Sequence, residues 1–159
     1  MATPWAPLNG ITAPISFVGL LRGAHGGTPL QWLNMIVGTG IDIIEIARVE
    51  EIMLRRGERF RARVFTAAEI AYCEPRGSRF ASYAARFAAK EAAMKALGTG
   101  WARGVAFREI EVVRGESGAP MICFYGKALE RFSTIGANSA HLSLSHSKEF
   151  AIAQVILED

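Results

Sequence analysis

The chain has 159 residues, of which 50% are hydrophobic and 21% are charged, which is enough for one packed domain. Its net charge of +3 favours anionic partners such as phosphates, nucleic acid or an acidic protein, without choosing among them. No apolar run approaches the roughly 18 residues of a membrane span, and two cysteines make no disulfide framework, so we expect a cytoplasmic protein without membrane association.

The first 34 residues differ in composition from the rest of the chain. They hold four prolines and five glycines, and Arg22 is their only formally charged side chain. No amphipathic period runs through them, which is typical of a disordered extension. A second interpretation is that Met35 is the natural start and that residues 1–34 come from a start codon assigned too far upstream. In both cases we expect one folded domain over residues 35–159.

Residues 35–159 alternate between patterns typical of strands and of helices. Apolar β-branched runs predict strands, whereas helical spacing of apolar residues and a capping box at Thr66–Glu69 predict helices. Gly57, Gly98 and Gly136 are the predicted helix stops. The expected strands are 36–44, 107–113, 121–124, 141–145 and 150–157, and the expected helices are 45–56, a short one from Ala67, 80–97 and 127–134. This mixture predicts the α+β class.

Asp42 stands in an otherwise apolar segment, residues 37–44. An unpaired carboxylate is costly to bury, so Asp42 either lies at an exposed strand end or binds something positive. A cap on the following helix fits the pattern equally well. The glycines at Gly38 and Gly40 allow a ligand or another backbone to approach the strand closely.

The long predicted helix carries charged residues on both flanks of its apolar stripe. Glu91 falls about 40° from Phe87 on the helical wheel, which is an unusual place for a carboxylate. Lys95 lies one turn further on and neighbours Glu91, while Arg86 and Lys90 lie on the other flank. The plain interpretation is an ordinary Glu91–Lys95 pair at the edge of the core. The other two cations would then extend to solvent.

Residues 141–153 place small polar side chains near a turn. Alternation directs His141, Ser143 and Ser145 to one side of a strand, and His146 follows where the strand gives way to the turn. An adjacent serine and histidine do not indicate a hydrolase, because no third member of a triad is apparent. Taken alone, the pattern favours the polar outer face of an edge hairpin.

Six arginines lie within residues 48–63. Arg48 and Arg55 are seven residues apart and share a helix face, which Arg59 joins if that face continues past Gly57. A solvated helix face accounts for such a cluster. The alternative is an electrostatic dock for an acidic partner.

Together these segments resemble the holo-[acyl-carrier-protein] synthase family of phosphopantetheinyl transferases. The matching motifs are GTGID at 38–42, RFAAKEA at 86–92 with Lys95 and GTG at 98–100, and LSLSH at 142–146. Their order and spacing agree from Met35 to about Leu157. The resemblance implies the fold of that family, in which a small antiparallel sheet packs with a long central helix and shorter helices. It also implies a homotrimer with sites between subunits.

The activity implied by the resemblance is transfer of 4'-phosphopantetheine from coenzyme A to a serine of apo-acyl-carrier protein, in fatty acid biosynthesis. Adenosine 3',5'-bisphosphate would be released. Asp42 and Glu91 are the implied ligands of Mg²⁺, an ion usually held by one or two carboxylates together with substrate phosphates. Glu91 and Lys95 are the implied catalytic residues, with Lys95 offsetting charge on the phosphate and protonating the leaving group. The general base is not identified.

Further roles follow from the same resemblance. The implied contacts to coenzyme A are Arg86, Lys90, Gly98, Gly100, Ser145 and His146. The implied dock for the acidic carrier protein consists of Arg48, Arg55 and Arg59, and binding there is expected to weaken steeply with salt.

Other functions fit the sequence less well. A small basic module for nucleic acid agrees with the arginines, but no stacking platform or groove-reading motif is present, so we expect no nucleic-acid partner. A non-catalytic coenzyme A-binding protein is disfavoured by the intact Asp42, Glu91 and Lys95. A transferase that serves polyketide or peptide synthases is typically longer and duplicated, and no repeat is apparent here.

Overall fold

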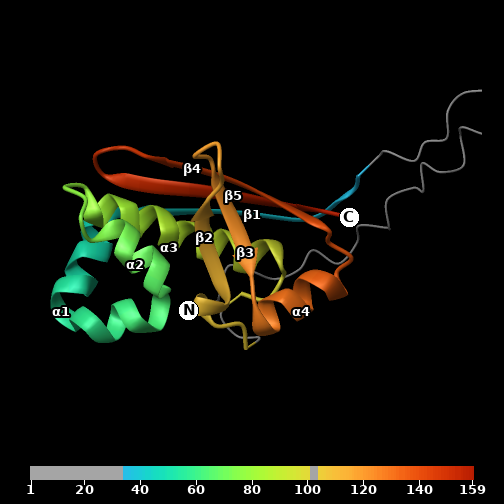
Figure 1. Cartoon of the computed structure of the whole chain (residues 1–159), viewed down its shortest axis with the longest axis horizontal. Coiled ribbons are helices and arrows are strands. Elements are labelled where there is room, and N and C mark those ends of the chain that lie inside the picture. The colour runs from blue at the N-terminus through green and yellow to red at the C-terminus, as the bar shows by residue number, and fades with distance from the viewer. Residues whose placement is uncertain (1–33, 101–103) are drawn as a thin grey trace, which may run out of the picture. The chain divides into compact units, whose positions relative to one another are not determined.

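A computed structural model describes residues 34–100 and 104–159 (Figure 1). It confirms the α+β class and the small antiparallel sheets expected from the sequence. The predictions for residues 1–34 fall outside the described residues, apart from Asn34. The elements are β1 (Ile36–Glu45), α1 (Ile46–Val64), α2 (Ala67–Cys73), α3 (Arg79–Ala96), the 3₁₀-helix η2 (Phe107–Glu109), β2 (Ile110–Arg114), β3 (Pro120–Phe124), α4 (Gly126–Thr134), β4 (Ser139–His146) and β5 (Phe150–Glu158).

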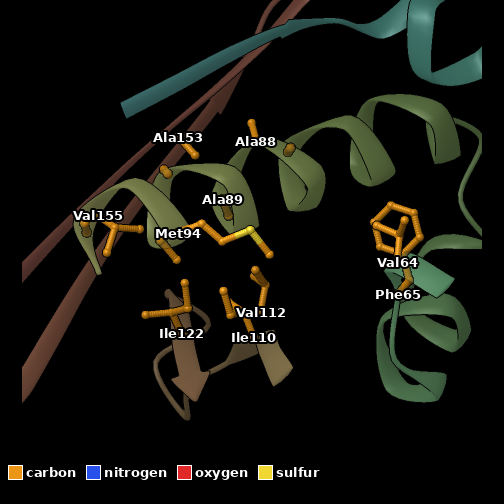
Figure 2. Close-up of a cluster of buried hydrophobic side chains, with 14 of the residues drawn as sticks. Val64, Phe65, Ala88, Ala89, Met94, Ile110, Val112, Ile122, Ala153 and Val155 are labelled. Atoms are coloured by element: carbon orange, nitrogen blue, oxygen red, sulfur yellow. The ribbon is translucent and has the colours of Figure 1, made fainter. Parts of the chain in front are cut away.

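Helix α3 is the centre of the domain. Strands β1, β5 and β4 form an antiparallel sheet in that order, and α3 packs on all three. Strands β2 and β3 form a separate antiparallel hairpin, and β2 also contacts α3. Figure 2 shows the core that results, with Met94 of α3 facing Ile110 and Val112 of the hairpin, and with Ala153 of β5 on the other side of the helix.

Small residues bring β1 and α3 into backbone contact. A Cβ atom added at Gly40 would lie 2.0 Å from the carbonyl oxygen of Ala92, and one added at Gly38 would lie 2.3 Å from that of Ala96. Only glycine leaves room for such an approach. The sequence allowed either a ligand or another backbone to approach the glycines of the GTGID motif. The structure shows that it is the backbone of α3.

One predicted boundary is confirmed and another is wrong. The backbone of α1 breaks at Gly57 (φ 46°, ψ −126°), where the sequence predicted a helix stop, and a second helical stretch, which was not predicted, follows the kink to Val64. Residues 107–109 form η2 and not the start of a strand. The amide of Ala106 donates to the Glu109 carboxylate at 2.9 Å, a local bond that competes with strand pairing.

The capping box predicted at the start of α2 is confirmed. The Thr66 hydroxyl accepts from the Glu69 amide, and the Glu69 carboxylate accepts from the Thr66 amide. Among the helices in the described ranges, none is long and apolar enough to cross a lipid bilayer.

Candidate active site

A groove of about 830 Å³ is lined by residues of β1, α1, α3 and the segment 105–107. Its volume lies within the range of small-molecule sites. The rings of Phe60, Phe87 and Phe107 line it and stack on one another, with centroids 6.2 Å and 5.3 Å apart. Its charged lining residues are two carboxylates and four arginines: Asp42, Glu91, Arg48, Arg55, Arg56 and Arg63. The groove thus joins an acidic place with a basic one.

Asp42 is held in the groove by an ion pair that the sequence did not indicate. Its Oδ1 accepts a bond of 2.9 Å from Nζ of Lys95, which also donates to the carbonyl of Ile41 at 2.8 Å. The side chain of Asp42 is 17% exposed and that of Lys95 is 49% exposed. Lys95 therefore pairs with strand β1. The plain interpretation, a pair between Lys95 and Glu91, is wrong. The contact of β1 with α3 makes this pairing possible.

Glu91 comes from the face of α3 that borders the same groove, and its side chain is largely buried. The structure therefore brings Asp42, Glu91 and Lys95 into one neighbourhood. In the described part of the chain, no three or more histidine, cysteine or acidic side chains are grouped so that they could hold a metal ion by themselves. Two carboxylates bordering a groove that can admit phosphates nevertheless fit Mg²⁺, which commonly takes only one or two from the protein.

The structure contradicts the assignment of Lys90 to coenzyme A. Its side chain is entirely buried, and Nζ lies 2.8 Å from Oε2 of Glu69, whose side chain is also entirely buried. Nζ also donates to the carbonyls of Phe107 and Ile110. Burial lowers the pKa of Lys90, and the neighbouring Glu69 opposes that shift. With its ammonium surrounded by protein oxygens, Lys90 cannot reach a ligand, and it does not extend to solvent either.

Arg86 lies outside the groove, in a second basic cluster. Its guanidinium is buried and sits 3.8 Å from the centre of the Tyr72 ring, while the guanidinium of Arg76 sits 3.3 Å from the same centre. Such cation–π contacts hold two positive groups close together. No sequence pattern indicates Arg76, because it follows α2 in a turn where no periodicity identifies a partner.

The other residues assigned to coenzyme A also lie outside the groove. Gly98 and Gly100 adopt φ angles of 66° and 53°, and their amides donate back to the last turn of α3, so both glycines terminate that helix. Ser145 and His146 end β4, exposed, opposite Ile152 and Ala151 of β5. Because β5 separates β4 from β1, these residues are about 10 Å from β1, two strand spacings away.

The arginines divide differently from the sequence prediction. Arg48 and Arg55 line the groove as their shared face implies, whereas Arg59 is exposed but does not line it. Arg56 and Arg63 line it instead. The kink at Gly57 shifts the helical phase. Residues after Gly57 therefore do not continue the helix face that residues before it form.

Comparisons with known proteins agree on one family. The family model of the 4'-phosphopantetheinyl transferase superfamily matches residues 38–155. A holo-[acyl-carrier-protein] synthase of Koribacter versatilis is 50% identical over 125 residues, which cover 79% of this chain and 100% of that protein. The crystal structure of the synthase from Neisseria meningitidis (35% identity) superposes with a TM-score of 0.71, covering 79% of this chain and 100% of that one. The crystal structure of the synthase from Helicobacter pylori in complex with coenzyme A (34% identity) superposes with a TM-score of 0.66 and covers 75% of this chain and 98% of that one.

Proposed function

Because the chain belongs to the 4'-phosphopantetheinyl transferase superfamily, and within it to the holo-[acyl-carrier-protein] synthases, we propose that it transfers 4'-phosphopantetheine from coenzyme A to a serine of apo-acyl-carrier protein. The serine oxygen forms a new bond to phosphorus as the pyrophosphate bond breaks, and adenosine 3',5'-bisphosphate leaves. The observation that carries the proposal is that Asp42 and Glu91 line one groove and that Lys95 pairs with Asp42. They come from two separate motifs, which the contact of β1 with α3 joins.

Asp42 and Glu91 are the residues that would hold Mg²⁺. The ion would supply positive charge to offset the negative charge that develops on the phosphates during transfer. The two carboxylates are held in different ways. Asp42 is fixed by its bond to Lys95, and Glu91 is fixed by the packing around α3. Each is therefore held in place before a substrate arrives, which reduces the cost of ordering the site.

Lys95 is the proposed proton donor to the leaving phosphate. Its side chain is half-exposed beside Asp42, which lines the groove, and two bonds to β1 orient its ammonium. A lysine ammonium has three donors, so one remains for a phosphate oxygen while the other two hold the strand. The bond to Asp42 thus gives the carboxylate a second role, that of aiming Lys95.

The arginines around the groove form the proposed dock for the acidic carrier. Arg48, Arg56 and Arg63 are exposed and line the groove, as does Arg55, which also pairs with Glu51 at 3.1 Å. Their charges would attract an acidic surface and orient its serine towards Asp42 and Glu91.

We further propose that this carrier serves fatty acid biosynthesis in the cytoplasm. The two cysteines, Cys73 and Cys123, are unpaired in the described residues, which agrees with that compartment.

A homotrimer with shared sites is the proposed assembly. The sheet face opposite α3 exposes Ile41 (55%) and Ile43 (61%), together with Ile152 of β5, which sits beside Ile43. Exposed apolar patches of this kind mark protein interfaces. One chain also leaves Ser145 and His146 far from its own groove, so a second copy is the proposed source of these coenzyme A contacts.

The deciding experiment is intact-mass spectrometry of apo-acyl-carrier proteins after incubation with this protein, coenzyme A and Mg²⁺. A gain of one phosphopantetheine, lost when a chelator is added, is the expected result. No gain with any of several carriers would contradict the transferase assignment. A gain that persists with the chelator would contradict the metal assignment alone, and carriers from fatty acid and polyketide synthesis compared side by side identify the substrate.

Shared sites are tested by mixing two inactive variants. Asp42→Ala and His146→Ala each remove one part of the site, and co-refolded mixtures contain sites with both parts intact if the parts come from different subunits. We expect activity to reappear in the mixture, with the mass of a trimer in light scattering. A mixture as inactive as its components, or a monomeric mass, would contradict the shared site.

A further inference from the structure

The ion pair between Lys90 and Glu69 connects three elements inside the domain. Lys90 lies on α3 and Glu69 on α2, and both side chains are fully buried. Glu69 also accepts from the amide of Thr66 at the start of α2 and from the amide of Val112 on β2. Its carboxylate therefore has three donors, all within 3.0 Å, and no part of it faces solvent.

The remaining bonds of Lys90 reach the wall of the groove. Its ammonium donates to the carbonyls of Phe107, at 2.9 Å, and of Ile110. The ring of Phe107 lines the groove and stacks on Phe87 of α3. Phe87 and Lys90 lie within one turn of Glu91, so the wall is fastened to the same stretch of helix that presents the proposed metal ligand.

Stability alone does not account for this pair. Removing two charges from water costs about as much as their attraction returns, and well-packed apolar pairs often replace buried ion pairs without loss. Hydrogen bonds differ from apolar contacts in having direction, since they fix where a donor and its acceptors lie. Four main-chain groups, at Thr66, Phe107, Ile110 and Val112, are fixed in this way relative to α3.

We propose that Lys90 and Glu69 are positioning residues, which hold the wall formed by residues 105–107 at a fixed distance from the face of α3 that carries Glu91. The inference rests on the proposed function, because this distance sets how the carrier serine meets the phosphate of coenzyme A beside Glu91. Errors of about 1 Å in such an alignment slow a reaction roughly 100-fold. The pair acts through the wall and touches neither substrate.

The test is the double variant Glu69→Gln/Lys90→Met. The introduced glutamine retains one oxygen, which can still accept from the amide of Thr66, whereas its NH2 group cannot accept from the amide of Val112. The methionine fills the space of the lysine stem, so both charges disappear together. We expect kcat to fall roughly 10- to 100-fold, with KM for coenzyme A and for the carrier unchanged within about twofold. The melting temperature is expected to fall by less than about 10 °C, because the charges are removed together and the amide of Val112 loses its acceptor. Unchanged kcat, or a loss that lies entirely in KM, would overturn the proposal.

The matched control is Glu74→Gln/Arg61→Met. This pair is partly buried, whereas the Lys90–Glu69 pair is fully buried. It joins residues from α1 and the end of α2, and neither residue lines the groove. Its removal is expected to leave kcat within about twofold of the parent value. A fall as large as that of the test variant would show that any interhelical ion pair matters equally, which would overturn a specific role for Lys90.

Hydrogen exchange gives a readout that needs no turnover. In Glu69→Gln/Lys90→Met, amides of residues 105–110 are expected to exchange faster, while those of β1 and β5 keep the parent rate. Unchanged exchange in 105–110 overturns the proposal even if the parent protein transfers nothing, so the two failures are distinguishable. If this double variant does not fold, Glu69→Gln/Lys90→Leu, which also removes both charges together, is measured by the same kinetics and exchange, and the same outcomes decide.

Discussion

Helix α3 carries two lysines five residues apart, and each forms an ion pair with an acidic residue from another element. Lys90 pairs with Glu69 in a place closed to solvent, whereas Lys95, which is half-exposed, pairs with Asp42, a lining residue of the groove. The buried pair bonds only to protein atoms, while the groove pair retains access for a ligand. Burial therefore distinguishes an enclosed pair from an accessible one, although both lysines belong to the same motif.

The largest expected effect concerns the acidic partner of the groove pair. Asp42→Ala removes one of two proposed metal ligands and the group that orients Lys95, so we expect turnover to fall about 1000-fold or more. Unfolding free energy should change by less than about 1 kcal/mol, because Lys95 can hydrate when its partner is lost. The measurement is the carrier-modification rate beside a thermal melt. Near-normal turnover in Asp42→Ala would contradict the metal assignment.

The buried pair should respond in the opposite way. Lys90→Met leaves the Glu69 carboxylate buried without its counter-charge, and we expect the free energy of unfolding to fall by about 3–5 kcal/mol. Denaturant titration measures it. The control is Arg55→Met, which breaks the exposed Arg55–Glu51 pair and is expected to cost at most about 1 kcal/mol. Equal losses in the two variants would remove the distinction between buried and open pairs.

Lys95→Met is expected to lower kcat roughly 100-fold while leaving the melting temperature almost unchanged, as loss of a proton donor does. Lys95→Arg sharpens the test, because arginine keeps the positive charge but holds its proton far more tightly. We expect Lys95→Arg to remain slow if proton donation matters. Full activity in Lys95→Arg would show that Lys95 contributes charge alone.

The support beneath the groove pair should be sensitive to a single methyl group. The Cβ of Gly40→Ala would lie 2.0 Å from the carbonyl oxygen of Ala92, so β1 must move away from α3. We expect a loss of about 1–3 kcal/mol in stability and a further loss of kcat, because Asp42 moves with its strand. Gly77→Ala is the control, since nothing lies within 4 Å of the added atom. Equal behaviour of both variants would contradict a requirement for close approach.

The sequence predicted most elements because their signals are local. The capping box at Thr66, the glycine that ends α3 and the alternation in β4 each depend on residues close in the chain. Pairing between distant residues has no such signal. Helical spacing placed Lys95 beside Glu91, but only the glycine-mediated contact of β1 with α3 makes Asp42 its partner. The burial of Lys90 likewise depends on where η2 and β2 pack, which no periodicity within α3 reveals.

The smallest expected effect is on the rate at which a buried cysteine is chemically labelled. Cys73 is fully buried on α2, and burial raises the pKa of its thiol to about 11. Since thiolates are the reactive form, Cys73 should resist iodoacetamide at about pH 8 while the partly exposed Cys123 reacts. Mass spectrometry of the labelled peptides measures both. In Lys90→Met, labelling of Cys73 should speed up because the region opens more often, whereas in Lys95→Met it should keep the parent rate. Equal acceleration in the two variants would mean that the two ion pairs support the same unit of structure.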